Sequence, residues 1–182
     1  MASATTIFIP GLLCTEYLFY HQRDAMPDGA LFADTRQHDT MTAMAEAALA
    51  QAPGQLIPIG LSMGGYVALE VLAQAPERVE RVALLDTNAR ADDPSAAARR
   101  RDLLRLAGRG RFLGVAPRLM PLYLHESRLE DEGLTGAVAG MAERLGVDVF
   151  RRQQGAILER KDHRQTLATY DCLLYTSGAA DA

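Results

Sequence analysis

A short stretch one third of the way along the chain constrains the fold more than any other. Residues 60–65, Gly-Leu-Ser-Met-Gly-Gly, follow an apolar run at 56–59 and precede a helical pattern at 66–72. This order predicts a strand, a tight turn and a helix, with Ser62 at the apex of the turn. A turn this sharp strains the backbone at its apex and crowds the strand against the helix. That crowding explains the glycines two residues before and after Ser62.

The same letters have a simpler explanation. Gly and Ser are common residues, and Ser62 could merely be the N-cap of a helix that begins after a glycine-rich turn. Pro58 also lies inside the predicted strand, where it cannot donate a hydrogen bond to a neighbouring strand. We interpret Pro58 as a local irregularity, because the apolar run and the helical pattern on either side of residues 60–65 favour the strained turn.

Strand and helix patterns alternate through the first half of the chain. Apolar runs at 5–9, 30–34, 56–59 and 82–86 are typical of strands, and helical patterns lie between them. The alternation predicts an α/β fold, with a predominantly parallel sheet and helices on both faces. One of these helices, which Thr40 should cap, carries an apolar stripe that we expect to face the core: Met41, Met44, Ala45, Ala48 and Leu49.

Candidate functional residues lie where the predicted strands end. In a parallel sheet with helices on both faces, ligands bind at the carboxyl ends of the strands. Leu12 follows the first strand and its Pro10-Gly11 turn, Ser62 follows the third strand, and Asp86 ends the fourth. We therefore expect these three residues to lie at one edge of the sheet.

The Gly-x-Ser-x-Gly turn between a strand and a helix resembles the nucleophile elbow of the α/β-hydrolase family. The resemblance covers about residues 5–172 and implies that Ser62 is a nucleophile. It also implies an oxyanion hole made by the backbone amides of Leu12 and Met63. Many members have His-Gly where this chain has Pro10-Gly11. The alternative to an oxyanion-hole role for Leu12 is that it belongs to an ordinary strand-to-helix turn.

Domain boundaries follow from the change of pattern after residue 87. We assign residues 1–87 to the N-terminal part of the α/β core and residues 88–170 to a helical cap over Ser62, which the family resemblance implies. Asp93-Pro94 should start the first cap helix, and Gly146 should end a later one that carries apolar residues on one face. The segment 112–124 is apolar but interrupted by prolines. Five arginines of this region could form an anion site, but a solvated face is the simpler interpretation: Arg99, Arg100, Arg101, Arg151 and Arg152.

The family resemblance implies an acid and a histidine after Ser62, and neither is evident. Asp86 is a possible alternative acid, or it hydrogen-bonds the loop at the cap entrance. His21 and His38 precede Ser62 in segments that we expect to be peripheral. His125 and His163 fall in the cap region, and His163 is the one most readily recruited as a base.

The last residues, 171–182, look like a truncated and non-native tail. A strand pattern starts at Leu173 and stops after Tyr175, and small and polar residues follow. We therefore expect an incomplete α/β-hydrolase fold, an uncovered sheet edge beside residues 82–86, and loose packing of residues 173–182. The consequence would be an inactive fragment of a longer enzyme.

Composition excludes several classes of function. The formal net charge of −4 gives no basic footprint for nucleic acid. Two distant cysteines, Cys14 and Cys172, have no metal-ligand spacing, and we expect reduced thiols, no metal and no cofactor. The basic, then apolar start of a signal peptide is missing, and no apolar stretch approaches the ~20 residues of a membrane span. These observations favour a cytoplasmic protein that binds a small-molecule substrate and does not associate with a membrane.

These observations combine into one functional expectation and two alternatives. The expectation is a serine hydrolase of the α/β-hydrolase fold, esterase-like, that acts on a small ester or related acyl substrate through Ser62. The first alternative is a non-catalytic ligand-binding protein on the same scaffold, because fold alone does not settle chemistry. The second is a lyase or carbon–carbon bond hydrolase of the same family.

Overall fold

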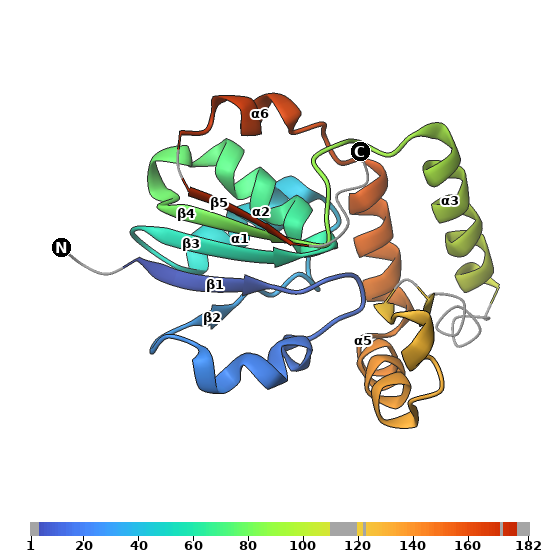
Figure 1. Cartoon of the computed structure of the whole chain (residues 1–182). Coiled ribbons are helices and arrows are strands. Elements are labelled where there is room, and N and C mark those ends of the chain that lie inside the picture. Colours follow the sequence, from blue (N-terminus) through green and yellow to red (C-terminus); the bar gives the residue numbers. More distant parts are fainter. Residues whose placement is uncertain (1–3, 110–119, 122, 172, 178–182) are drawn as a thin grey trace.

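The computed structural model describes residues 4–109, 120–121, 123–171 and 173–177. Within these ranges, five strands form a single parallel sheet in the order β2-β1-β3-β4-β5 (Figure 1). The strands are β1 (Thr5–Ile9), β2 (Leu31–Phe32), β3 (Leu56–Leu61), β4 (Arg81–Leu85) and β5 (Leu173–Ser177). The predicted parallel α/β architecture is therefore confirmed, and Pro58 is accommodated inside β3, where it pairs in register with Ile7 of β1.

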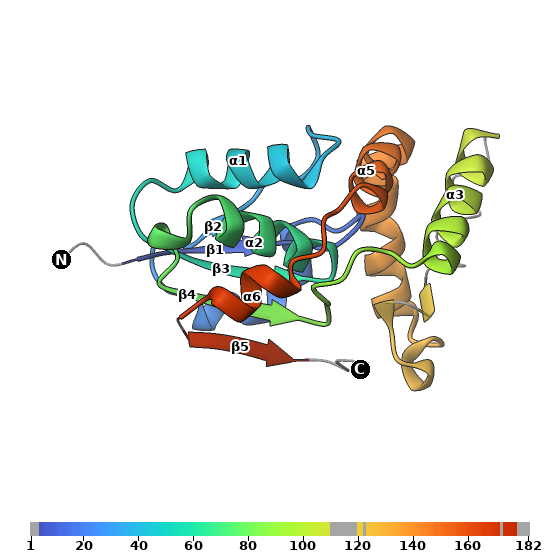
Figure 2. The same ribbon diagram turned by 90° about the horizontal axis from the view of Figure 1, so that it is seen from above.

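Helices cover both faces of the sheet, but unequally. The helices α1 (Met41–Gln51), α2 (Met63–Gln74) and the short α6 (Arg164–Thr169) lie on one face, and the 3-10 segment η1 (Glu16–Ala25) lies on the other (Figures 1 and 2). The sequence predicts an ordinary helix at 16–26, and the structure has a tighter one with an irregular residue at Phe19. The Phe19 ring packs 5.0 Å from Phe8 of β1 and so anchors η1 to the sheet.

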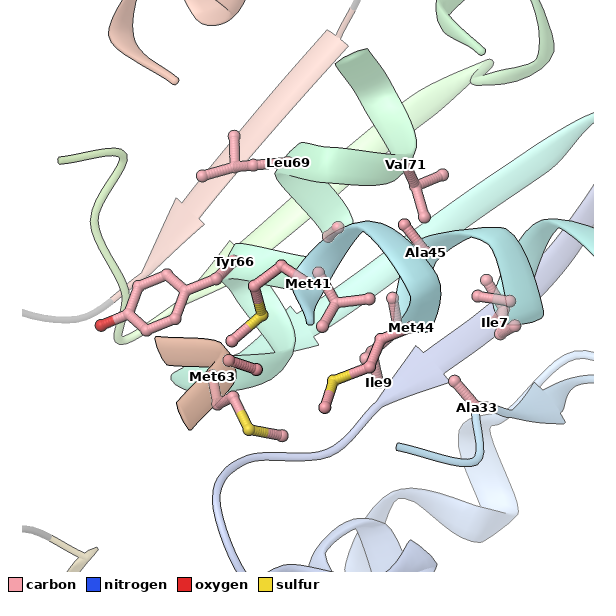
Figure 3. Close-up of a cluster of buried hydrophobic side chains, with 14 of the residues drawn as sticks. Ile7, Ile9, Ala33, Met41, Met44, Ala45, Met63, Tyr66, Leu69 and Val71 are labelled. Atoms are coloured by element: carbon pink, nitrogen blue, oxygen red, sulfur yellow. The ribbon is translucent and has the colours of Figure 1, made fainter. Parts of the chain in front are cut away.

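The main core lies between the sheet and the helices α1 and α2. Thr40 caps α1 as expected, since its hydroxyl accepts a hydrogen bond from the Ala43 amide at 3.1 Å. Four residues of the predicted stripe are buried, Met41, Met44, Ala45 and Ala48, and Leu49 packs against them. Figure 3 shows three residues of this stripe, Met41, Met44 and Ala45, beside strand and α2 side chains, among them Ile7, Ile9, Met63, Leu69 and Val71. Burial of this apolar layer is the main source of stability for the sheet.

A helical insertion stands beyond the carboxyl ends of the strands (Figure 1). It contains α3 (Pro94–Gly108), capped by Asp93 as predicted, the short η4 (Glu126–Arg128) and α5 (Glu132–Leu158). Gly146 interrupts α5 with φ 76°, in agreement with a helix that ends there. Most of segment 112–124 lies outside the described residues. Within 88–170, α6 does not join this insertion; it lies over the sheet beside α2 (Figure 2).

Buried charged side chains join the two segments that connect the insertion to the sheet, one before α3 and one after α5. Arg160 donates to the Asp92 carboxylate at 2.6 Å and to the Arg90 carbonyl at 2.9 Å, and both charged side chains are 5% exposed. Arg160 also lies 4.2 Å above the ring of Tyr66 in α2. Arg100 of α3 donates to the same carboxylate. Arg100 therefore makes a structural ion pair that fixes the base of the insertion.

The expectation of an uncovered edge beside residues 82–86 is wrong. β5 pairs in parallel with β4 along its whole length, from Arg81 opposite Leu173 to Leu85 opposite Ser177. The local sequence pattern ends early, but the free backbone groups of β4 are enough to pair a fifth strand. β5 itself then forms the edge, with Leu174 38% and Tyr175 54% exposed. Residues 172 and 178–182 lie outside the described part of the chain.

Candidate active site

Ser62 sits on the strained turn that the sequence predicts. Its backbone has φ 53° and ψ −114°, a conformation that residues with a side chain rarely adopt. A Cβ at Gly60 would overlap the carbonyl of Gly64, and a Cβ at Gly64 would overlap the carbonyl of Ile9 in β1. The glycines are thus needed for close packing of β3, α2 and β1, as expected. Ser62 does stand at the N-cap position of α2, but its side chain makes no capping hydrogen bond, so capping does not occupy its hydroxyl.

Backbone hydrogen bonds hold the turn and leave the hydroxyl free. The Ser62 amide donates to the Leu85 carbonyl at 2.9 Å, which ties the turn to the end of β4. The Ser62 carbonyl accepts from the Gly65 amide at 2.9 Å and from the Thr87 hydroxyl at 2.8 Å. No side chain in the described part of the protein hydrogen-bonds the Ser62 hydroxyl. The turn is therefore rigid, and its hydroxyl is available to a ligand.

The turn after β1 lies against the Ser62 turn. β1 and β3 are neighbouring parallel strands with Ile9 opposite Gly60, so both end at the same sheet edge. A Cβ built on Gly11 would lie 3.6 Å from the Ser62 Cβ. Among the described residues, the amides of Leu12 and Met63 have no hydrogen-bond acceptor. Two unpaired amides beside a free hydroxyl are the arrangement that an oxyanion hole requires.

Among the described residues, three that are not glycine have positive φ, and all three follow strands at this edge. Leu13 (φ 54°) follows β1, Ser62 (φ 53°) follows β3, and Asp86 (φ 44°) follows β4. Each such conformation costs about 1–3 kcal/mol and persists only where surrounding contacts hold it. Backbone strain in folded proteins gathers at functional sites. Its presence on three neighbouring strand ends marks this edge as the candidate site.

A cavity of about 500 Å³ lies above this edge. Ser62 and Asp86 contribute its sheet side, and the aromatic residues Tyr17 and Tyr20 of η1 contribute another wall. The insertion closes the cavity with mostly apolar side chains: Tyr123, Leu124, Leu134, Ala137, Val138 and Met141. Arg128 also reaches the wall, but it is paired with Asp131 at 2.7 Å. The cavity therefore suits a small, largely apolar ligand with a polar group directed at Ser62.

Asp86 lies on the wall of the cavity, and its side chain accepts no hydrogen bond from the residues that the structure describes. The predicted alternative, a hydrogen bond between the Asp86 side chain and the loop at the cap entrance, is absent from the described residues. Its carboxyl group is thus free to meet a ligand or a base.

The histidines are not arranged as the sequence suggested. His163 is committed elsewhere: its Nε2 lies 2.9 Å from the buried Glu70 carboxylate, and its Nδ1 lies 3.2 Å from the Thr166 hydroxyl. The expectation that His163 is the most readily recruited base is therefore wrong. His21 was expected to be peripheral, yet it lines the cavity that holds Ser62. His38 and His125 do not line that cavity.

Two further side chains at the site were not identified from the sequence. Tyr123 donates from its hydroxyl to the Leu12 carbonyl at 2.7 Å, and burial raises the pKa of Tyr123, so the phenol keeps its proton. The Cys14 thiol donates to the same carbonyl at 3.4 Å. Burial raises the pKa of Cys14 to about 12, so this thiol is not a rival nucleophile at neutral pH. The turn after β1 is thus held by neutral donors.

The described ranges offer neither a candidate metal site nor a candidate membrane-spanning helix. There, no group of three or more His, Cys, Asp or Glu side chains is placed to hold a metal ion. None of the helices described has the length and apolar character that crossing a membrane requires.

Comparison with known proteins agrees with the geometry. The sequence profile of the alpha/beta hydrolase fold matches residues 24–174. Among solved structures, an esterase from Thermogutta terrifontis has a TM-score of 0.81 at 21% identity, over 96% of this chain and 70% of its own. An enol-lactonase from Burkholderia xenovorans has a TM-score of 0.81 at 20% identity, over 96% and 72%. A hydrolase from Pseudomonas aeruginosa has a TM-score of 0.83 at 18% identity, over 98% and 73%. No curated protein matches the sequence.

Proposed function

Because the chain belongs to the α/β-hydrolase fold family, we propose that Ser62 is an acyl-accepting nucleophile for a small ester or related acyl substrate. The observation that carries the proposal is the free hydroxyl of Ser62 on a strained turn, beside two unpaired amides and under an apolar cavity. Esterase and enol-lactonase are the names of two structural neighbours, and a lactone is a cyclic ester.

In the proposed reaction the Ser62 oxygen attacks the carbonyl carbon of the ester. The electron pair of the carbonyl moves to its oxygen, and the amides of Leu12 and Met63 stabilise the negative charge. The carbonyl then re-forms as the C–O bond to the leaving group breaks, and the leaving alcohol departs with the proton that the Ser62 hydroxyl has lost. The acyl group stays on Ser62 until water attacks it, which releases the carboxylic acid and returns a proton to the Ser62 oxygen. Each amide is expected to contribute ~3 kcal/mol of transition-state stabilisation.

Turnover by the 182 residues is expected to be low. A serine hydrolase needs a base that accepts the Ser62 proton and later activates water. Among the described residues no histidine is hydrogen-bonded to Ser62, and His163 is held by Glu70. Asp86 faces the cavity and could orient a base. We propose that acylation is slow here and that deacylation, which needs the same base, is slower still.

The experiment is acetylation of Ser62 by a nitrophenyl acetate, followed by mass spectrometry of the Ser62 peptide. Leu12→Pro is the sharpest variant, because proline removes the backbone N–H and is favoured at the second position of a β-turn, the place that Leu12 has in the turn closed by the Cys14 amide and the Gly11 carbonyl at 3.1 Å. Leu12→Ala is its matched control, since it shortens the side chain and keeps the amide. We expect Leu12→Pro to slow acetylation by about 100-fold. We expect Leu12→Ala to slow it far less and Ser62→Ala to abolish it. Equal rates of acetylation for Ser62→Ala and wild type would refute the assignment of Ser62 as the nucleophile.

One observation favours a second candidate, a non-catalytic ligand-binding protein on the same scaffold. The Ser62 hydroxyl has no base among the described residues, but the cavity is well formed. The same assay separates the two candidates: a binding protein would leave Ser62 unacetylated while an ester analogue still occupies the cavity.

The expected partner is a small molecule. The cavity volume and the net charge of −4 support a neutral small-molecule substrate rather than nucleic acid or a membrane. A cytoplasmic location is part of the same proposal.

A further inference from the structure

Three side chains of η1 form a ladder beside the cavity. Side chains three positions apart in a 3-10 helix lie almost directly above one another, and Tyr17, Tyr20 and Arg23 have this spacing. The rings of Tyr17 and Tyr20 stack with their centroids 5.3 Å apart and their planes inclined by 25°. The Arg23 guanidinium lies 5.9 Å from the centroid of the Tyr20 ring. The contacts within the ladder therefore set the orientation of both rings.

Two further contacts fix the position of η1. The Phe19 ring packs 5.0 Å from Phe8, which ties η1 to the sheet. The Thr15 hydroxyl accepts a hydrogen bond from the Tyr17 amide at 3.3 Å and so caps η1, while the Thr15 amide donates to Sδ of Met141 in α5 at 3.5 Å. The start of η1 is thus held by the sheet on one side and by a helix of the insertion on the other.

The stacked rings present aromatic surface at the cavity that holds Ser62. Tyr17 is 46% and Tyr20 is 50% exposed, and both line that cavity. Exposed rings gain when an apolar group displaces the water on them, and a second aromatic ring is favoured beyond the area that it buries. Because the rings already hold each other in place, a ligand loses little affinity to the ordering of these side chains.

The charges around the cavity favour a neutral ligand. Arg128 is paired with Asp131, whereas Asp86 has no charged partner among the described residues, so the lining keeps an unbalanced carboxylate that repels anions. Arg23 already places a positive charge over the Tyr20 ring, which disfavours a cation at the same stack. The rest of the lining from the insertion is largely aliphatic: Leu124, Leu134, Ala137 and Val138.

We propose that the stacked rings of Tyr17 and Tyr20 form an aryl-binding subsite, which selects neutral esters with an aromatic ring as the substrates of Ser62. The inference rests on the proposed function of Ser62 and adds a substrate class to it. A saturated substrate of the same size fits the same cavity but lacks the ring-to-ring contact. The two tyrosines therefore determine specificity and take no part in the chemical step.

The probes are a matched pair of neutral amides, N-benzylacetamide and N-(cyclohexylmethyl)acetamide. They differ only in the saturation of the ring, and because serine attacks an amide far less readily than an ester, binding is measured apart from chemistry. The saturated ring is the more hydrophobic one, so a purely aliphatic wall binds the cyclohexyl compound more tightly, and an aromatic subsite reverses the order. Titration of methyl-labelled protein, followed by NMR at the Met141 methyl group in the cavity lining, gives both dissociation constants.

Five variants make the test specific. Tyr17→Leu and Tyr20→Leu replace a ring by an aliphatic side chain at positions exposed enough for the fold to tolerate the change. Tyr17→Phe and Tyr20→Phe keep the ring and lose only the hydroxyl. Tyr175→Leu is the matched control, because Tyr175 is 54% exposed on β5 and does not line the cavity.

We expect the wild type to bind N-benzylacetamide about threefold to tenfold more tightly than the cyclohexyl compound, the range for an aromatic pair beyond area burial. This preference should fall below about twofold in Tyr17→Leu and Tyr20→Leu and persist in the two phenylalanine variants and in Tyr175→Leu. Tighter binding of the cyclohexyl compound by the wild type, a preference unchanged in both cavity leucine variants, or an equal loss in Tyr175→Leu would overturn the proposal.

Failure of the proposed function would look different. N-Benzylacetamide should protect Ser62 of the wild type from acetylation by the nitrophenyl acetate, and it should do so at lower concentration than the cyclohexyl compound. If Ser62 is not acetylated at all, the nucleophile assignment fails, while the two dissociation constants still decide whether the tyrosines form an aryl subsite.

Discussion

Glu70 is a buried carboxylate whose removal should destabilise the protein strongly. Its side chain is 3% exposed in the middle of α2. One carboxylate oxygen lies 2.9 Å from Nε2 of His163. The other accepts from the Thr42 hydroxyl at 2.8 Å, from Lys161 at 3.0 Å and, more weakly, from Gln74 at 3.4 Å. The group therefore joins α1, α2 and the segment that precedes α6.

The size of the effect follows from which partners are buried. Lys161 is 66% exposed and regains water when Glu70 is lost, so its share is small. His163 is 7% exposed and would keep an unpaired ring nitrogen. We therefore expect Glu70→Leu to lower the free energy of unfolding by about 3–5 kcal/mol, the usual range for one partner of a buried pair. Glu70→Gln keeps the volume and an acceptor oxygen, so it should lose about 1–2 kcal/mol.

The pH dependence has a definite sign. The hydrogen bond from His163, with smaller contributions from Lys161 and Thr42, holds the pKa of Glu70 well below its usual range despite burial. Since the pKa is lower in the folded state, the unfolded state binds more protons, and stability rises with pH. The contribution of Glu70 is complete above the unfolded pKa of about 4.3 and is lost as the pH falls below it.

Urea unfolding at several pH values between 7 and 3 measures both effects. The wild type should lose stability more steeply than Glu70→Gln as the pH falls below about 4.3. Glu77→Gln, at an exposed position in the short 3-10 segment Pro76–Arg78 that follows α2, is the matched control. Parallel curves for wild type and Glu70→Gln, or a loss under about 1 kcal/mol in Glu70→Leu, would refute this account.

Three further predictions concern the site and its supports. Gly64→Ala should lower the free energy of unfolding by about 3 kcal/mol in urea unfolding, because its Cβ would overlap the Ile9 carbonyl and neither backbone can yield easily. His21→Gln should leave the rate of Ser62 acetylation within about threefold of wild type, since His21 makes no hydrogen bond to Ser62; a fall to the Ser62→Ala level would identify it as the base. In a Cys172→Ser background, Cys14 should resist alkylation by iodoacetamide at pH 8 until urea unfolds the protein, and rapid labelling of the folded chain would contradict its raised pKa.

The parts of the structure that depend on local sequence were predictable. The Ser62 turn follows from glycines where the strand and the helix must touch, and the cap residues Thr40 and Asp93 lie where the helices begin. The break at Gly146 also follows from a local preference. Alternating strands and helices then imply a parallel sheet, and parallel strands bring Leu12 and Ser62 to one edge.

The supports of the site were not predictable because they join segments far apart in the sequence. Gln153 contacts Leu13 across 140 residues and Tyr123 contacts Leu12 across 111. No periodicity or motif marks either residue. His163 illustrates the same limit: its position after Ser62 suggested a base, but a partner 93 residues away, Glu70, occupies its ring nitrogen. The pairing of β5 likewise depends on the free edge of β4 rather than on the short local pattern at residues 173–177.

The central claim is that Ser62 is a nucleophile whose oxyanion is held by the Leu12 and Met63 amides. The most direct measurement is a crystal structure of the chain with phenylboronic acid bound. The account predicts a tetrahedral boron bonded to the Ser62 oxygen, with one boron oxygen about 2.7–3.1 Å from both amide nitrogens. A boron bonded to another side chain, or a Ser62 adduct whose oxygens all point away from these amides, would contradict it.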